Sequence, residues 1–180
     1  MRAYFYPETG FIWFTYIGPE EKAPTGDFIE VAEDAMPLGQ EFYRVDENRQ
    51  LVERYNPEAL REAINDERQR RLGADGLFVF QDHAFQFDRE ARENIQGAHS
   101  LARDAIDYNG AVQGDFLWHG ASFPFVFIDA ENTPVPMDAQ TVVAFAQAAG
   151  MFKQAVIIAA RTLKDMDPIP MDFTDDKYWP

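Results

Sequence analysis

The strongest periodic signal in the chain lies between residues 138 and 165. Apolar side chains recur there three or four positions apart: Val142, Phe145, Ala149, Phe152, Val156, Ala159 and Leu163. This spacing aligns them on one face of an α-helix, and Asp138 stands where an N-cap residue is expected. The pattern therefore predicts a long helix ending near Asp165. Gly150 inside it costs about 1 kcal/mol relative to alanine, so we expect another element to approach closely there.

Two shorter helices are predicted upstream. Asn56 and Pro57 suit the N-cap and first helical positions of one, which stops at Gly73. It has few large apolar residues, namely Leu60, Ile64 and Leu72. We expect this helix to be largely exposed, or to bury a face against a partner. Asp88 can cap the other helix, residues 89–107, because its apolar stripe has helical spacing. That stripe consists of Ala91, Ile95, Ala98, Ala102 and Ala105.

Two short strand pairs are predicted on either side of the second helix. In Leu77–Phe87, apolar positions alternate on both sides of a turn placed at residues 81–84. A second pair lies within Pro124–Met137, separated by a polar turn. Pro134 and Pro136 cannot donate to a ladder, so the strand that holds them should be an edge strand.

The first 55 residues predict a small antiparallel meander, because short aromatic or β-branched runs alternate with Gly- and Pro-containing turns. These runs are Ala3–Tyr6, Phe11–Ile17, Phe28–Val31, Glu41–Val45 and Gln50–Arg54. Most aromatic side chains are expected in the core. For the meander these are Phe11, Trp13 and Phe14, and under the helices they are Trp118, Phe123, Phe125 and Phe127.

Together these elements predict an α+β protein in which the meander precedes a helix–hairpin–helix–hairpin–long helix series. We expect three parts: a β meander at 1–55, an α+β module at 56–165, and an extended tail at 166–180. The tail holds three prolines and four aspartates, so it cannot be helical throughout and needs anchors. The candidate partner-binding anchors are Met171, Phe173, Tyr178 and Trp179. They could dock on a neighbouring subunit or on the chain's own core.

Charge excludes some classes of partner. The 31 acidic residues against 16 basic ones give a net charge of −15, which disfavours nucleic acid and anionic membrane surfaces. No run of about 18 apolar residues is present, so no membrane-spanning helix is expected. A signal peptide is not expected either, because Pro7 and Gly10 interrupt the N-terminal apolar run. The absence of cysteine excludes disulfides and thiolate metal sites.

No combination of residues predicts catalysis, a cofactor or a metal ion. His83, His99 and His119 lack metal-site spacing, and we expect them in a turn, on a helix flank and in a loop. The sequence has no nucleophile elbow and no phosphate loop. The aspartates of 172–176 lack the spacing of a calcium loop, so we expect a solvated tail there. A pair of carboxylates for glycoside hydrolysis stays open, because so many acids are present.

Residues at the joints of these elements form a pattern of their own. From the first helix onward the pattern comprises Arg70-Arg71-Leu72, Gly76–Phe80, Phe85–Asp88, Asn94–Ala98, Asp129–Asp138, Phe145–Gln147 and Ala160–Asp165. Upstream it comprises Tyr6–Gly10, Gly18-Pro19, Ile29–Val31 and Tyr43–Asp46. With this pattern the chain resembles an uncharacterised domain family found in bacteriophage and prophage tail proteins. The chain departs from it at Phe127, where such modules often carry tryptophan.

The resemblance implies a non-enzymatic structural component of a tailed bacteriophage virion, located at the tail tip, baseplate or fibre attachment. Its partners would be other tail, baseplate or fibre proteins, and the protein would be made in the bacterial host cytoplasm. The helical stripes allow a homo-oligomer without requiring one. The family brings no catalytic residues. The alternatives are a tail-fibre assembly chaperone and a glycan-binding or glycan-cleaving tail module.

Overall fold

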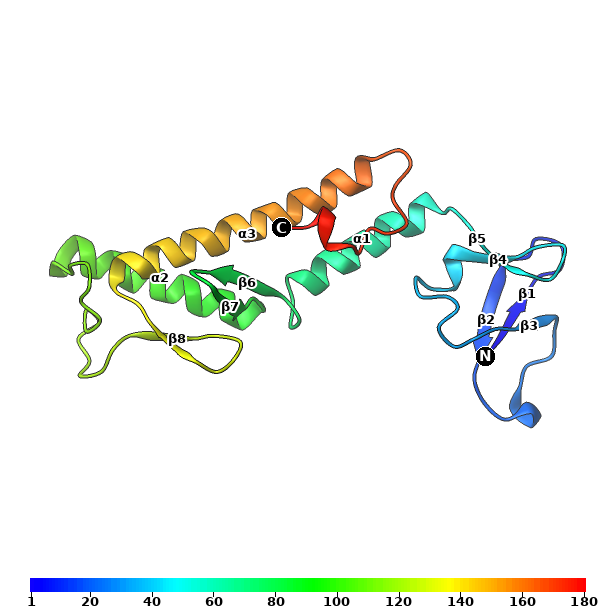
Figure 1. Ribbon diagram of the computed structural model, residues 1–180, viewed down its shortest axis with the longest axis horizontal. Coiled ribbons are helices and arrows are strands. Elements are labelled where there is room, and N and C mark those ends of the chain that lie inside the picture. The colour runs from blue at the N-terminus through cyan, green and yellow to red at the C-terminus, as the bar shows by residue number, and fades with distance from the viewer. The chain divides into compact units, whose positions relative to one another are not determined.

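The computed structural model describes residues 1–180 and divides them into two compact units, residues 1–62 and 63–180 (Figure 1). The first unit consists mainly of short antiparallel strands, and the second consists of helices with two hairpins. The predicted α+β fold class is therefore confirmed. The chain passes from one unit to the next within the helix α1 (Pro57–Arg71), and the tail 166–180 belongs to the second unit.

The first unit holds a three-stranded antiparallel sheet and a separate hairpin. The sheet consists of β1 (Arg2–Phe5), β2 (Ile12–Tyr16) and β3 (Phe28–Glu30), and the hairpin pairs β4 (Tyr43–Val45) with β5 (Leu51–Glu53). Strand β1 is central, since β3 pairs with β1 and not with its neighbour in sequence, β2. Short 3₁₀ turns at Glu20–Lys22 and Gln40–Phe42 connect the strands.

Gly10 holds the sheet and the hairpin together. Its carbonyl accepts a hydrogen bond of 2.9 Å from the Val45 amide. Its φ of 71° is left-handed, and a Cβ there would lie 2.0 Å from the Val45 carbonyl oxygen. Only glycine permits this approach, so a residue that looks like a simple turn breaker in the sequence is also a packing residue.

The expected burial of three aromatic residues on or beside β2 is wrong. Phe11, Trp13 and Phe14 are each exposed by about two-fifths, from 38% to 41%. Strand β2 is an edge strand of a small sheet, so its side chains are only partly covered. The rings of Trp13 and Phe14 instead stack on one another, with centroids 5.9 Å apart.

The second unit is built around two antiparallel helices, α2 (Arg89–Asn109) and α3 (Ala139–Asp165), which pack along each other (Figure 1). The predicted N-caps are confirmed. Asp88 accepts from the Ala91 amide at 2.8 Å, and Asp138 accepts from the Thr141 amide at 2.7 Å. In α1 the Asn56 side chain likewise accepts from the Ala59 amide. Local capping chemistry therefore fixes where each helix begins.

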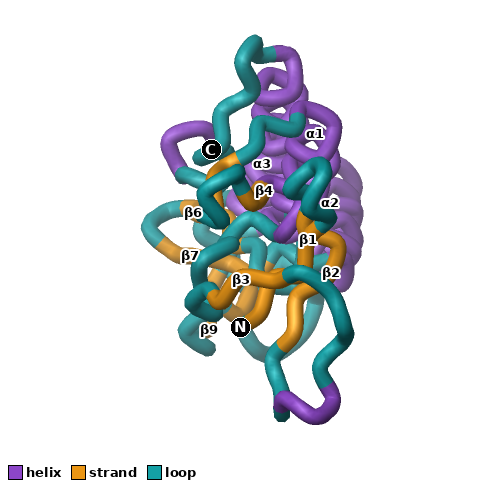
Figure 2. The backbone as a smooth tube through the Cα atoms, turned by 90° about the vertical axis from the view of Figure 1, so that its right-hand side faces the viewer, coloured by secondary structure: helices purple, strands orange, loops and turns teal.

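The two predicted hairpins are present. Strands β6 (Leu77–Phe80) and β7 (His83–Gln86) are joined by Gln81 and Asp82, both with positive φ. This turn is two residues shorter than expected, because His83 and Ala84 already pair in the ladder. Strands β8 (Val126–Ile128) and β9 (Pro134–Pro136) form the second hairpin. Both hairpins lie on the same side of the α2–α3 pair (Figure 2).

Phenylalanine rings fill the space between the hairpins and α3. Phe85 and Phe127 each lie 4.7 Å, centroid to centroid, from Phe145 of α3, and Phe78 lies at 5.1 Å. Trp118 is also buried and donates its indole N–H to the Met137 carbonyl at 3.0 Å. Phe123 is an exception to the expected core, because it is 64% exposed.

Two expectations about the helices need correction. Helix α1 buries its apolar face within the chain and not against a partner, since Leu60 and Ile64 are buried, as is Leu72 just beyond its end. No element approaches Gly150, because a Cβ placed there would meet no atom within 4 Å. The sequence predicts no membrane-spanning helix, yet α3 is long and apolar enough to cross a membrane by length and composition alone, and 22% of its most apolar window is buried.

Candidate interaction surfaces

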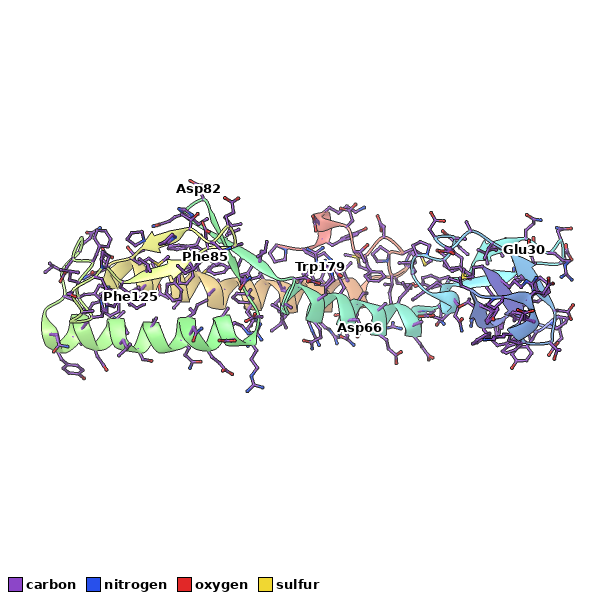
Figure 3. The ribbon with its side chains drawn as sticks, turned by 90° about the horizontal axis from the view of Figure 1, so that it is seen from below. Glu30, Asp66, Asp82, Phe85, Phe125 and Trp179 are labelled. Atoms are coloured by element: carbon purple, nitrogen blue, oxygen red, sulfur yellow. The ribbon has the colours of Figure 1, made fainter.

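The C-terminal segment folds back onto α1, where Trp179 is its main anchor (Figure 3). Among the predicted anchors, Phe173 and Trp179 are buried, and Met171 and Tyr178 are half-buried. The Trp179 indole N–H donates to the Phe173 carbonyl at 2.7 Å. The burial of Phe173 and Trp179 lies within the chain itself, so binding of a partner through these four residues stays a prediction.

Arg71 of α1 holds this segment from the helix side. Its guanidinium lies 4.9 Å from the centroid of the Trp179 ring. It also donates to the Thr174 carbonyl at 3.0 Å and to the Asp176 carboxylate at 2.7 Å. One side chain thus makes a cation–π contact, a backbone hydrogen bond and an ion pair. We call this arrangement the C-terminal clasp.

Glu67 sits one turn earlier on α1 and orients Arg71. It is 7% exposed and accepts from Arg70 at 2.7 Å and from Arg71 at 2.6 Å. Burial alone would raise the pKa of Glu67, but the two guanidinium groups outweigh it and hold that pKa below its ordinary value. The i, i+3 and i, i+4 spacing was visible in the sequence. The contact between Arg71 and Asp176 could not be predicted in this way, because the two residues are 105 positions apart in the sequence.

The clasp segment carries its own ion pairs. Lys177 pairs with both Asp172 and Asp175, and the Tyr178 hydroxyl donates to Asp172 at 3.1 Å. The Lys177 ammonium lowers the pKa of the Asp172 carboxyl, and the pair raises the pKa of Lys177. Asp172 and Asp175, which were expected only to be solvated, therefore also form ion pairs with Lys177.

A second, largely apolar stripe on α3 is exposed except at Ala148, which is half-buried. Its members are Ala144, Ala148, Met151, Ala155, Ile158 and Thr162, which we call the outer stripe. Their spacing of four and three places them on one face, offset by about a third of a turn from the buried stripe. Met151 is 74% exposed and Ile158 is 53% exposed. Exposed contiguous apolar surface of this kind commonly marks an interaction site.

The charge of α3 differs from that of the rest of the chain. No acidic residue occurs between positions 139 and 164, so all 31 acids lie elsewhere. The charged residues of this segment are Lys153, Arg161 and Lys164. A locally uncharged to weakly basic face in a chain of net charge −15 can approach another molecule with little repulsion.

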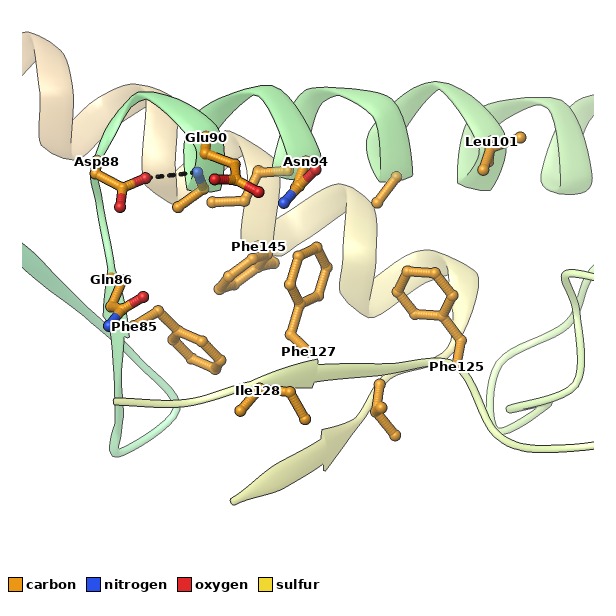
Figure 4. Close-up of a pocket in the computed structure, with 14 residues that line it drawn as sticks. Phe85, Gln86, Asp88, Glu90, Asn94, Leu101, Phe125, Phe127, Ile128 and Phe145 are labelled. Atoms are coloured by element: carbon orange, nitrogen blue, oxygen red, sulfur yellow. Dashed lines mark hydrogen bonds between the residues drawn. The ribbon is translucent and has the colours of Figure 1, made fainter. Parts of the chain in front are cut away.

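A groove of about 620 Å³ lies between α2 and the hairpin strands β7 and β8 (Figure 4). Phe85, Phe127 and Phe145 point into it, and Glu90 and Asn94 of α2 line its upper edge. The Asp88 carboxylate at its end is bound to the Ala91 amide as a helix cap. The groove is therefore an apolar recess with a polar edge, and its polar side chains include amides as well as carboxylates.

His83 does not behave as the expected solvated turn residue. Its Nδ1 lies 2.9 Å from the buried Asp129 carboxylate, which also accepts from the Thr133 amide at 2.8 Å. The Thr133 amide and the His83 ring hold the pKa of Asp129 below its ordinary value. The Ala130 amide donates to the Ala84 carbonyl at 2.8 Å. Together these bonds connect the two hairpins.

The other two histidines, and the serine next to His99, occupy structural positions. His99 is half-buried on α2, and His119 lies in a loop with its ring centroid 5.6 Å from that of Trp118. The Ser100 hydroxyl donates to the Gln96 carbonyl within its own helix. No group of three histidine, aspartate or glutamate side chains is placed to hold a metal ion.

The chain matches a family model over residues 55–176, and that family is described as a domain of unknown function, DUF4376. Because the match spans more than half of the chain, the protein belongs to this family. The matched range runs from just before α1 to Asp176, so it includes Arg71 and Asp176 of the clasp but ends before Trp179. No curated protein and no solved structure matches the chain.

Proposed function

We propose that this member of the DUF4376 family is a non-enzymatic structural component of a tailed bacteriophage virion. Its place is at the tail tip, baseplate or fibre attachment, where it works through protein–protein contacts. The observation that carries the docking role is the outer stripe of α3, an acid-free apolar face left exposed in a strongly acidic chain. The phage assignment is supported by the resemblance of the residues at the element joints to tail modules.

Four acidic side chains of the second unit hold the fold together. Asp88 and Asp138 cap helices, Asp129 joins two hairpins, and Glu67 orients the arginines of the clasp. Each of these carboxylates is committed to holding backbone or side chains in place. A catalytic pair would need two carboxylates free to face one substrate.

The family match covers most of the second unit. It includes the three helices, both hairpins of the second unit and the C-terminal segment as far as Asp176. A domain defined over this range contains the whole outer stripe, together with Arg71 and Asp176 of the clasp but not Trp179. The outer stripe is carried by one continuous helix, α3, and a rigid element of this kind suits a docking face.

Quantitative mass spectrometry of purified tailed particles tests the proposal. We expect the protein at a fixed ratio to the tail proteins and at a constant level after further purification. Particles grown with the double variant Met151→Glu/Ile158→Glu should lack it, whereas Val112→Glu, which alters an exposed apolar residue outside the stripe, should be incorporated normally. Absence of the wild-type protein from mature particles would overturn the structural role.

The same preparation separates the alternatives. An assembly chaperone would be bound to fibre protein in infected-cell lysate and be missing from, or substoichiometric in, finished particles. A glycan-acting module would bind or cleave host polysaccharide. The aromatic groove between α2 and the hairpin strands would then be the binding site. Binding or turnover that is lost in Phe127→Ala or Asn94→Ala would favour this second alternative over the structural role.

A further inference from the structure

We infer that the outer stripe of α3 pairs with the same stripe of a second copy, with the two helices antiparallel. This inference deepens the proposed function by naming one partner of the docking face. It rests on three properties of α3: the spacing of the stripe, the distribution of charge along the helix, and the order of large and small residues. None of these depends on where the protein is located in a virion.

The spacing of the outer stripe suits a long helix–helix contact. Its six members repeat at intervals of four, three, four, three and four residues from Ala144 to Thr162. This is the heptad pattern by which two helices keep one face in contact over several turns. The stripe spans 18 residue steps, or roughly 27 Å of helix. Gln147 and Gln154 flank it, and both can remain solvated at the edge of an interface.

Charge favours a second copy over an oppositely charged partner. A basic protein would be drawn to the acidic surfaces that most of this chain presents. The outer stripe lies in the one long segment without acids, which is the surface where two copies with a charge of −15 repel least. A neutral apolar face is best matched by another neutral apolar face.

The order of residue sizes favours the antiparallel arrangement. If the two helices cross near residue 153, Met151 faces Ala155 of the second copy, and Ala148 faces Ile158. Ala144 then faces Thr162. Each large side chain meets a small one, as close packing requires. A parallel pair in register would set Met151 against Met151 and Ala148 against Ala148, alternating crowding with gaps.

Symmetry and dipoles agree with this arrangement. A two-fold axis through the middle of the stripe makes the contact self-complementary, which is the commonest form of a homodimer interface. The antiparallel order also opposes the two helix macrodipoles. The alanines let the helix axes approach closely, toward the lower end of the usual 8–10 Å range.

Sedimentation equilibrium of the full chain tests the pairing. We expect a monomer–dimer equilibrium with a dissociation constant on the order of micromolar, because a single short stripe buries a modest area. Met151→Glu/Ile158→Glu should weaken the dimer by at least about 30-fold. Val112→Glu, which changes an exposed apolar residue elsewhere, should leave it unchanged. Circular dichroism would verify that each variant is folded.

Disulfide trapping tests the orientation, and the chain contains no cysteine of its own. Ala144→Cys mixed with Thr162→Cys should cross-link rapidly, whereas Ala144→Cys alone should not, because its two copies lie roughly 27 Å apart along the antiparallel helices. Rapid cross-linking of Ala144→Cys with itself would overturn the antiparallel arrangement. A wild-type protein that stays monomeric at about 100-fold above the expected dissociation constant would overturn the pairing.

A vesicle experiment tests whether the outer stripe binds a lipid bilayer in place of a second copy. Co-flotation of the wild type, but not of Met151→Glu/Ile158→Glu, with neutral phosphatidylcholine vesicles would overturn the pairing in favour of a bilayer. Failure of this inference is distinct from failure of the proposed function. A monomer that still enters particles removes only the pairing, whereas a stable dimer absent from particles removes only the virion role.

Discussion

Gly150 lies in the middle of α3, yet a methyl group at its Cα would meet no atom within 4 Å. Glycine in a helix costs about 0.5–1 kcal/mol relative to alanine, so Gly150→Ala should stabilise the isolated protein by about that amount and raise the melting temperature by a few degrees. Thermal unfolding followed by circular dichroism measures this. A fall in melting temperature would mean that the position needs glycine for a reason internal to the chain.

Glu67 predicts a pH dependence at the scale of one residue. Its pKa is held below that of the unfolded chain, so it adds stability at pH values above about 4.3, the unfolded value. That stability is lost as the pH falls through the lower, folded pKa. Glu67→Gln should therefore cost about 1–2 kcal/mol near pH 7, and the cost should vanish under strongly acidic conditions.

Urea denaturation across a pH series measures the difference between Glu67→Gln and the wild type. Asp66→Asn is the matched control, because Asp66 is an exposed acid next to Glu67 on the same helix (Figure 3). The control should show no comparable pH-dependent difference. An equal cost for Glu67→Gln at all pH values would contradict the ionic role of Glu67 and leave only its packing.

At the scale of elements, the clasp sets how the last residues are held. Arg71→Ala removes the contact with the Trp179 ring and the bonds to Thr174 and Asp176 at once, and it leaves Glu67 with one arginine. We expect a loss of about 2–3 kcal/mol and faster hydrogen exchange in residues 169–180 than in the wild type. Hydrogen exchange read by mass spectrometry checks the location of the effect.

Arg71→Lys separates charge from geometry. Lysine keeps the charge but cannot reproduce the planar fork that reaches two acceptors and lies over the indole, so it should restore only part of the protection. Full protection with lysine would show that a positive charge alone suffices. The exposed ion pair Arg89–Glu93 on α2 provides a comparison, because removing it should cost well under 1 kcal/mol.

The sequence predicts where a helix begins, because the capping residue is next to it in the chain. It does not predict which distant segments pair with one another. The caps Asn56, Asp88 and Asp138 carry the chemistry that starts each helix, so the helices are placed to within a residue or two. The pairing of β3 with β1, and not with β2, has no comparable signal. The clasp has no local sequence signal either, because the sequence allows Trp179 to dock on a neighbouring subunit as readily as on its own chain.

The outer stripe illustrates a second limit of reading the sequence. Two stripes with helical spacing run along α3, and the one with larger side chains is the stronger signal for the buried face. That stripe is largely buried, with Val142, Phe145 and Val156 fully enclosed. The second stripe is rich in alanine, and only its exposure in the folded chain distinguishes it from an ordinary helix flank. Composition gave one further hint, the absence of acids from residue 139 to 164.

At the scale of the whole molecule, net charge and the apolar stripe act in opposite directions on self-association. Each chain carries a charge of −15, so a dimer brings two like-charged bodies together, and their repulsion is screened over about 10 Å at 0.1 M salt. The stripe itself contributes no ion pair that salt would weaken. Raising the ionic strength should therefore tighten the dimer by several-fold between roughly 0.05 and 0.5 M sodium chloride.

Sedimentation at a series of salt concentrations checks this, with sodium chloride chosen because sulfate would also strengthen apolar burial. Charge-reducing variants in the first unit, such as Glu20→Gln/Glu21→Gln, provide the control, because they should tighten the dimer at low salt and flatten the salt dependence. A dimer that weakens as salt rises would mean that Lys153, Arg161 or Lys164 attracts an acidic surface of the second copy. The contact would then be electrostatic and heterologous, which permits open chains of subunits instead of a closed pair.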